Sequence, residues 1–408
     1  MRLAIFAVLV LLFDLYAFQA IRTLASGWPV LARNISYALY WLIPLAFMSW
    51  LGLSAADVTD GWPKATTTLL RTFFFIAYVS KLLIAGILLI DDLRRLSVLA
   101  YQYFSTGGEL QTGRSRFLTQ LGLLLGAVPF VSLIYGVLRN PYRYRLFRER
   151  VRVAQLPEAL EGLKIVQISD IHSGSFLHKE PVRNAVDLIN AQEPDLVFFT
   201  GDLVNNKADE AQPFVDVFDK IRAKHGVFSV LGNHDYGDYV RWEKEADKLA
   251  NMELLEDTHR RLGWQLLRNE HRSIQINGEP VAIIGVENYS AHPRFPKYGD
   301  LKQASAGTEQ AKLQLLLSHD PSHWEEEVVR EFKNIALTFS GHTHGMQFGV
   351  EIPGWFKWSP IKYVYKQWAG LYQREQQYLY VNRGLGYLGY PGRVGILPEV
   401  TLIELTKA

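Results

Sequence analysis

Five short segments of this 408-residue chain combine carboxylates, histidines and an asparagine. They are Ser169-Asp170-Ile171-His172, Gly201-Asp202, Gly232-Asn233-His234-Asp235, Ser318-His319-Asp320 and Gly341-His342-Thr343-His344. Each follows an apolar run that is typical of a buried strand. The chain has no cysteine, so a metal here would be bound by nitrogen and oxygen, which suit hard and borderline divalent cations. The combination predicts a two-metal centre that hydrolyses phosphoesters.

The chemistry expected of such a centre follows from its carboxylates. A carboxylate can bridge two cations about 3.5 to 4 Å apart, and a hydroxide held between them attacks phosphorus in line while both cations neutralise charge on the phosphoryl oxygens. Each segment alone has a simpler explanation, because Gly-Asp is a common turn and Asn233 or Asp235 could cap a helix. Only the set of five, in this order, favours a catalytic site.

The elements that must position these residues alternate between strands and helices. Residues 163–168, 196–199 and 227–231 are predicted strands, and residues 180–191 and 209–223 are predicted helices. Residues 273–276 and 281–286 are predicted to form a hairpin through Asn277-Gly278. Further strands are expected at 313–317, 335–339, 378–381 and 400–404. The order fits an α/β fold of four layers, αββα, whose strand ends bring the five segments together.

The first third of the chain differs in composition from the rest. Four apolar stretches, each long enough to cross a bilayer, lie at 3–21, 35–56, 72–90 and 117–138. The first could instead be a cleaved signal peptide, but Asp14 interrupts it and no clear cleavage site follows. We therefore predict an all-α transmembrane domain of four helices at 1–138, a basic juxtamembrane linker at 139–162 and a catalytic domain at 163–408.

Charged residues indicate how the chain sits in the membrane. Arginines cluster directly after the fourth span, at positions 139, 143, 145, 148, 150 and 152. Such clusters favour the cytoplasmic side, so we expect a multi-pass protein of the plasma or inner membrane with a cytoplasmic catalytic domain. The cluster could also bind anionic lipid headgroups. A net charge of only +2 disfavours a nucleic-acid partner. Asp14 and Lys81 lie inside spans and could be functional, or Lys81 could snorkel to the interface or pair within the helix bundle.

Residues 163–408 resemble the calcineurin-like metallophosphoesterase family, whose pattern is D-x-H, G-D, G-N-H-[DE], H and G-H-x-H. The resemblance implies one metal held by Asp170, His172 and His344, and a second held by Asn233, His319 and His342. It implies that Asp202 bridges the two, that His234 acts as general acid or electrostatic stabiliser, and that Asp235 orients His234. His323 and His178 are the alternatives to His319 and His172, and the spacing disfavours both. Manganese, iron and zinc all suit these ligands.

Features of the C-terminal segment resemble a membrane-associated bacterial subgroup of phosphodiesterases, one branch of which resembles UDP-diacylglucosamine hydrolases. Met346 stands where that subgroup commonly has glycine. The aromatic segment from Gly354-Trp355-Phe356-Lys357-Trp358 to Trp368 could be a lip that enters the bilayer interface or could pack over a sheet edge. Arg383 could bind a phosphate or form a structural salt bridge.

The sequence therefore predicts a membrane-anchored, metal-dependent phosphoester hydrolase with two divalent ions. A phosphodiester or pyrophosphate, such as the lipid-linked UDP-diacylglucosamine, is the expected substrate. The alternatives are a phosphomonoesterase, a nucleotide phosphodiesterase only localised to the membrane, and a catalytically silent membrane scaffold. No pattern in the sequence indicates an oligomeric state.

Overall fold

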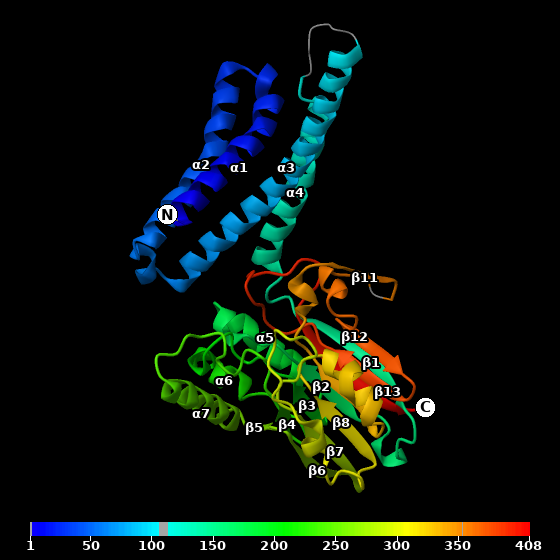
Figure 1. Ribbon diagram of the computed structural model, residues 1–408. Coiled ribbons are helices and arrows are strands. Elements are labelled where there is room, and N and C mark those ends of the chain that lie inside the picture. The colour runs from blue at the N-terminus through cyan, green and yellow to red at the C-terminus, as the bar shows by residue number, and fades with distance from the viewer. Residues whose placement is uncertain (1, 106–112, 353) are drawn as a thin grey trace. The chain divides into compact units, whose positions relative to one another are not determined.

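The chain divides into two compact units in a computed structural model, which describes residues 2–105, 113–352 and 354–408. The first unit is Met1–Tyr135 and the second is Gly136–Ala408 (Figure 1). The first consists of long helices, and the second contains every strand that the structure describes.

The helices of the first unit are apolar along most of their length. They are α1 (Arg2–Leu24), α2 (Val30–Ala55), α3 (Lys64–Ser105) and α4 (Arg116–Arg139), the last turn of which belongs to the second unit. All four contain stretches long and apolar enough to cross a membrane. The prediction of four spans is thus confirmed. Helix α3 extends well beyond its predicted span of 72–90 because its polar flanks also adopt the helical conformation.

A buried ion pair joins α1 and α3. Lys81 Nζ lies 2.6 Å from Asp14 Oδ1, and the side chains of Lys81 and Asp14 are 7% and 0% exposed. The Tyr78 hydroxyl donates to the other carboxylate oxygen of Asp14 at 2.9 Å. A charge buried among apolar helices is costly unless it is paired. The two charges therefore satisfy each other, and of the roles left open for Lys81 the contacts favour pairing within the bundle.

Two six-stranded sheets form the centre of the second unit. The first sheet has the order β1-β14-β2-β3-β4-β5 and the second has the order β12-β13-β9-β8-β7-β6. The first sheet comprises β1 (Arg145–Val153), β2 (Lys164–Ile168), β3 (Leu196–Phe199), β4 (Val227–Ser229), β5 (Trp264–Leu266) and β14 (Glu399–Lys407). The second comprises β6 (Glu270–Ile276), β7 (Glu279–Gly285), β8 (Leu313–Leu317), β9 (Ile335–Ser340), β12 (Gly370–Arg374) and β13 (Gln377–Val381). Strands β10 (Val350–Ile352) and β11 (Phe356–Trp358) form a separate hairpin.

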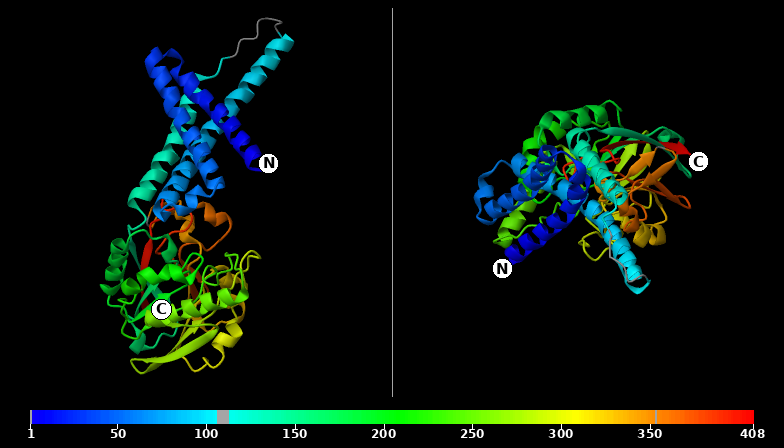
Figure 2. Two further views of the ribbon diagram at one scale, coloured as in Figure 1. Left: turned by 90° about the vertical axis from the view of Figure 1, so that its left-hand side faces the viewer. Right: turned by 90° about the horizontal axis from the view of Figure 1, so that it is seen from above.

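Three layers of apolar side chains hold these elements together. One lies between the first sheet and helices α5 (Lys179–Asn190), α6 (Val215–Phe218) and α7 (Glu245–Arg261). A second lies between the two sheets, and a third lies between the second sheet, α8 (Leu301–Ser305) and α9 (Val329–Glu331). Helices α5 to α7, in green, lie at the left of the unit in Figure 1 and face the viewer in the left panel of Figure 2. The predicted αββα fold is confirmed.

Two predictions at the level of single elements are wrong. The predicted linker at 139–162 contains β1, which pairs in parallel with β14 over its whole length. Its arginines suggested a solvated segment, but they alternate with apolar residues, and an edge strand can expose its charged positions. The predicted helix at 209–223 is a 3₁₀ segment, Ala208–Phe214, followed by the short α6. Pro213 lies inside it and removes a helical hydrogen bond.

The ion pair of the first unit gives a stability prediction. The variant Lys81→Met leaves the Asp14 carboxylate buried without a cation, and we expect it to lower the free energy of unfolding by about 3 to 5 kcal/mol. The double variant Asp14→Asn/Lys81→Met should recover most of this loss because no unpaired charge remains. Unfolding of the full chain in mixed micelles, titrated with sodium dodecyl sulfate, measures both. Equal stability of the single variant and the parent would contradict the pairing.

Candidate metal centre

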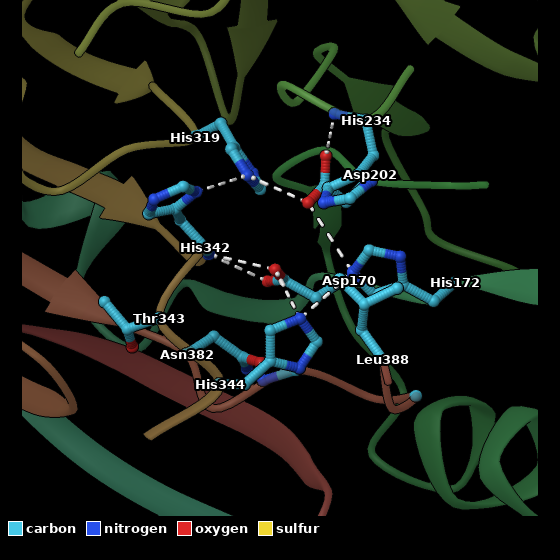
Figure 3. A network of polar contacts seen from close by, with 12 residues as sticks. Asp170, His172, Asp202, His234, His319, His342, Thr343, His344, Asn382 and Leu388 are labelled. Carbon is cyan, nitrogen blue, oxygen red and sulfur yellow. Dashed lines mark hydrogen bonds and ion pairs between the residues drawn. The ribbon is translucent and has the colours of Figure 1, made fainter. Parts of the chain in front are cut away.

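The predicted site residues lie at the carboxyl ends of adjacent strands. Asp170 and His172 follow β2, Asp202 follows β3 and Asn233 and His234 follow β4 in the first sheet; His319 follows β8, and His342 and His344 follow β9, in the second. The two sheets pack face to face, so these loops meet at one edge of the sandwich. Figure 3 shows the side chains of Asp170, Asp202 and the neighbouring histidines gathered in one network of polar contacts.

Asp202 occupies the middle of the cluster. Its Oδ2 lies 3.6 Å from His172 Nε2 and 3.2 Å from His319 Nε2, as the dashed lines in Figure 3 show. Both imidazoles are fully buried. One carboxylate oxygen thus faces ligands from both predicted metal positions, which is the placement that a bridging carboxylate needs.

Two groups of side chains flank Asp202. On one side, His344 Nε2 lies 3.2 Å from Asp170 Oδ1 and 3.0 Å from His172 Nε2. On the other side, His342 Nδ1 lies 2.8 Å from Asn233 Oδ1 and 3.3 Å from His319 Nε2. Metal-ligating atoms of Asp170, His172 and His344, and those of Asp170, Asp202 and His319, lie within 4.8 Å of one another. The first of these groups has the same members as the ligand set predicted for one metal, and the second combines His319 of the other predicted set with Asp170 and the predicted bridge Asp202.

The backbone of this cluster is strained. Five of its residues have positive φ values in the left-handed region: Asp170 (49°), His172 (47°), Asp202 (61°), His342 (69°) and His344 (51°). This conformation is unfavourable for residues with a Cβ and is concentrated at functional sites. The turns aim the side chains inward at a cost in backbone energy, which is expected of a site built to bind a ligand.

Glycines in the motifs make room for the carboxylates. A Cβ on Gly341 would lie 1.9 Å from Ser169 Oγ and 2.2 Å from Asp170 Oδ2. A Cβ on Gly232 would lie 2.2 Å from Asp202 Oδ1. Both contacts are far below van der Waals distance, so the glycines of these two segments are required by packing around Asp170 and Asp202.

Hydrogen bonds on the outer ring nitrogens orient the histidines. His172 Nδ1 lies 3.2 Å from the Val204 carbonyl and His319 Nδ1 lies 2.7 Å from the Thr200 carbonyl. Each carbonyl fixes the proton on Nδ1 and leaves Nε2 free to face the centre. For His342 the roles are reversed, because Nε2 contacts the Tyr365 hydroxyl at 2.8 Å.

Tyr365 was not predicted as part of the site. Its hydroxyl contacts His342 and donates to Asp320 Oδ2 at 3.1 Å, so His342, Tyr365 and Asp320 form a chain of polar contacts. The tyrosine comes from a loop more than 20 residues after the last motif, where no ligand pattern marks it. Asp320 lies inside the Ser318-His319-Asp320 motif, and its position beside a ligand is the one signal that could have indicated a supporting role.

His234 is oriented by a backbone carbonyl and not by Asp235. Its Nδ1 lies 2.6 Å from the Asn205 carbonyl, and its backbone N–H donates to Asp202 Oδ1 at 2.9 Å. The Asp235 carboxylate instead accepts the backbone N–H groups of Asp202, Leu203 and Gly232 at 2.8 to 2.9 Å. The role predicted for Asp235 is therefore wrong, since its carboxylate is fully used in holding two motif loops together.

Burial controls the protonation of the site in the absence of a cation. It raises the pKa of the Asp170 carboxyl to about 6, lowers the pKa of His172 to about 3 and lowers that of His342 to about 4. Burial also lowers the pKa of His319, but the charges of Asp202 and Asp170 outweigh it and bring the pKa to about 10. Neutral imidazoles offer a lone pair to a metal, whereas His319 must first lose a proton.

The centre opens into a cavity of about 550 Å³. Asp202, Asn233, His234 and His344 form part of its polar wall, with the exposed Arg294 among the other lining residues. Four other lining residues are apolar: Phe295, Ile361, Val364 and Leu388. A substrate bound here would meet histidine, carboxylate and guanidinium groups together with hydrocarbon.

The alternatives left open by the sequence differ in their surroundings. His323 is bound to Ser318 Oγ at 2.8 Å and to Glu327 at 2.7 Å, in contacts separate from the cluster. His178 is the residue before α5 and takes no part in either metal-ligating group. The Arg383 side chain is 3% exposed and lies between Glu399 at 2.6 Å and Glu351 at 2.5 Å. Of its two predicted roles, the structural salt bridge is the one that the contacts favour.

Comparison with known proteins adds two family matches. Residues 1–141 match the model described as "Probable Calcineurin-like phosphoesterase, transmembrane domain", and residues 163–346 match "Calcineurin-like phosphoesterase". A transmembrane protein with metallophosphoesterase domain from Danio rerio is 29% identical over 71% of this chain and 63% of its own length. The metallophosphoesterase YkuE of Bacillus subtilis is 27% identical over 66% of this chain and 89% of its own length. The resemblance is therefore not confined to bacterial proteins.

The surroundings of Arg383 give a prediction that separates its two roles. The variant Arg383→Met removes the cation between two buried or nearly buried carboxylates, and we expect a loss of about 3 to 5 kcal/mol in stability. The matched variant Arg374→Met, at a side chain 61% exposed, should change stability by less than about 0.5 kcal/mol. Denaturant unfolding of the full chain in detergent compares them. Unchanged stability of Arg383→Met with a raised KM would instead identify a phosphate ligand.

Proposed function

We propose that this chain, which belongs to the calcineurin-like metallophosphoesterases, hydrolyses a lipid-linked phosphodiester or pyrophosphate at the membrane. The family assignment makes it a metal-dependent phosphoester hydrolase, and the four apolar helices make it a membrane protein. The class of ester, the number of metals and the roles of single residues are the parts that we propose.

The observation that carries the proposal is the position of Asp202 between two sets of nitrogen and oxygen ligands. We assign Asp170, His172 and His344 to one divalent cation, Asn233, His319 and His342 to the other, and Asp202 to both. The fit is supported by nitrogen and oxygen atoms of these side chains that face one another at 2.8 to 3.6 Å. Two divalent cations would activate a water molecule and neutralise charge on the phosphoryl oxygens.

His234 is the side chain that we assign to the leaving group. Its Nδ1 is held by the Asn205 carbonyl, which leaves Nε2 for the substrate, and the residue lines the cavity. In the protonated form it would donate a proton to the departing oxygen, and in the neutral form it would donate a hydrogen bond to a phosphoryl oxygen. Asn205 acts by positioning His234, because it fixes the tautomer and direction of the ring.

The walls of the cavity favour a diester over a monoester. A monoester has one organic substituent and a nearly dianionic phosphate, whereas a diester has organic groups on both sides and one negative charge. Arg294 is the one Lys or Arg among the residues that line the cavity, and the apolar residues Phe295, Ile361, Val364 and Leu388 can receive an organic group. UDP-diacylglucosamine is one amphipathic pyrophosphate that meets this description.

We place the catalytic unit on the cytoplasmic side. The arginines at 139, 143, 145, 148, 150 and 152 directly follow the fourth span, and a short cytoplasmic flank is where such an excess is expected. A catalytically silent scaffold is disfavoured because no residue of the family pattern is replaced in the described site.

The proposal predicts a specific pattern of activities. Full-length protein purified in detergent and loaded with Mn²⁺ should hydrolyse bis(p-nitrophenyl) phosphate faster than p-nitrophenyl phosphate and should release UMP from UDP-diacylglucosamine if that lipid is its substrate. The variant His234→Asn should lower kcat by about 10² to 10⁴ without changing the bound manganese. Asp202→Asn should lose both activity and manganese.

The control is His271→Asn, at a histidine on β6 whose Nδ1 contacts the Ala304 carbonyl outside the cavity. It should retain full activity and metal content. Preference for the monoester would overturn the diester assignment. Undiminished activity of Asp202→Asn would overturn the bridging role, and inactivity of the parent on all three substrates with two manganese ions bound would favour the scaffold.

A further inference from the structure

An unusual surface covers residues 346–364 of the catalytic unit. Its apolar and aromatic side chains point outward, and two of them, Trp355 and Tyr363, are 81% and 74% exposed. We call this surface the apolar edge, and its members are Met346, Phe348, Val350, Ile352, Trp355, Phe356, Tyr363 and Val364. Monomeric soluble domains rarely expose contiguous apolar side chains on this scale.

Half of these residues lie in the segment 346–352, which ends in β10, and the direction of this segment is inverted. Met346, Phe348, Val350 and Ile352 are exposed, whereas the residues between them face the protein. Gln347 donates to the Tyr390 and Gly392 carbonyls, and Glu351 accepts from Arg383. A strand beside an ordinary core buries its apolar face and exposes its polar face. The polar contacts of Gln347 and Glu351 fix the opposite arrangement, so the outward direction of the apolar face is built into the fold.

The segment that carries the apolar edge is hydrogen-bonded to Val394, and the neighbouring Arg393 is hydrogen-bonded to residues at the end of the fourth span. Gly349 N–H donates to the Val394 carbonyl at 2.9 Å, and Val394 N–H donates to the Gln347 carbonyl at 2.8 Å. The neighbouring residue, Arg393, donates its backbone N–H to the Gly136 carbonyl at 3.3 Å and accepts from Asn140 Nδ2 at 2.8 Å.

All of these residues belong to the second unit, and Gly136 lies in the last turn of α4. In Figure 1 the orange segment around β11 and the red loop before β14 lie side by side. One loop, which contains Arg393 and Val394, therefore connects residues 346–352 with Gly136 and Asn140 at the end of the fourth span.

The same segment also forms a wall of the cavity. The 3₁₀ turn Pro360–Tyr363 contributes Ile361 to the cavity, and Val364 and Tyr365 follow it there. Val364 is 57% exposed and so belongs to both surfaces, while Tyr365 contacts His342. A continuous path of side chains thus leads from the apolar edge to the metal centre.

We propose that the apolar edge enters the headgroup region of the bilayer and that a lipid phosphoester passes along it to the metal centre. Tryptophan and tyrosine favour this depth of a membrane, and the exposed Lys362 and Lys366 suit anionic headgroups. A second copy of the chain is the competing occupant. The bilayer is favoured because hydrogen bonds of Val394 and Arg393 link the edge to Gly136 and Asn140, the residues at the end of the fourth span along the chain. The lipid-delivery part rests on the proposed function.

The absence of cysteine permits a direct test of the membrane contact. Trp355→Cys and Tyr363→Cys, each labelled with the fluorophore NBD, are reconstituted as full chains in vesicles of phosphatidylcholine and phosphatidylglycerol. Leu249→Cys on α7, at a residue 58% exposed, is the matched control. We expect nitroxide-labelled lipids to quench the labels at 355 and 363 strongly and the control weakly. Equal quenching at all three positions would overturn the proposal. Blue-shifted emission at 355 and 363 that reverts on dilution of the protein, without quenching by the labelled lipids, would also overturn it, because a second copy of the chain would then cover the edge.

A second measurement tests delivery of the substrate. The double variant Trp355→Ser/Tyr363→Ser should hydrolyse soluble bis(p-nitrophenyl) phosphate within about twofold of the parent, because neither side chain lines the cavity. Its kcat/KM for phosphatidyl-p-nitrophenol in vesicles should fall by about tenfold, since it has lost two interfacial aromatic side chains. Equal loss on both substrates would indicate a role in folding and would overturn the delivery role.

The two measurements separate this inference from the proposed function. If the labels are quenched but the parent hydrolyses neither ester, the membrane contact stands and the delivery of substrate is overturned. Hydrolysis of the soluble ester by a parent whose labels are not quenched would overturn the apolar edge alone.

Discussion

Two buried carboxylates, Asp170 and Asp202, impose the constraint on which the rest of the catalytic unit depends. Both are almost fully inaccessible to water, and burial of like charges close together is costly unless cations or hydrogen bonds compensate. Burial, with Asp202 nearby, raises the pKa of Asp170 to about 6. Within the described site, the compensation comes from histidines. Divalent cations would neutralise the two carboxylates more completely than the histidines do. The site is therefore best understood as a metal centre.

The loops around the carboxylates show what this arrangement costs the fold. Five ligand residues adopt the left-handed conformation, and Gly232 and Gly341 lie so close to the carboxylates that a Cβ cannot be accommodated. Asp235 ties two of the loops together through backbone N–H groups. Strain of this kind persists only where the surrounding structure holds it in place. The two packed sheets supply that rigidity, because each ligand loop leaves the end of a buried strand.

The sequence predicted those parts of the structure that depend on local patterns. Strand ends followed by Asp, His and Asn indicated seven candidate ligands that the fold gathers in one cluster, and Asn277-Gly278, both with positive φ, placed the hairpin between β6 and β7. Strand β1 was missed because its arginines hide an alternating pattern. Tyr365 and the true contacts of Asp235 and Arg383 were not predictable, since each depends on which distant loop lies beside it. The outward face of β10 was also missed, because its direction is set by contacts with residues 383 to 394.

The most direct test of the central claim is the electron paramagnetic resonance spectrum of the full-length protein with two Mn²⁺ ions bound. If Asp202 bridges two cations, the spectrum should show exchange coupling between the ions, and Asp202→Asn should abolish the coupling. A spectrum of isolated Mn²⁺ at full loading, unchanged by the substitution, would contradict the two-metal account.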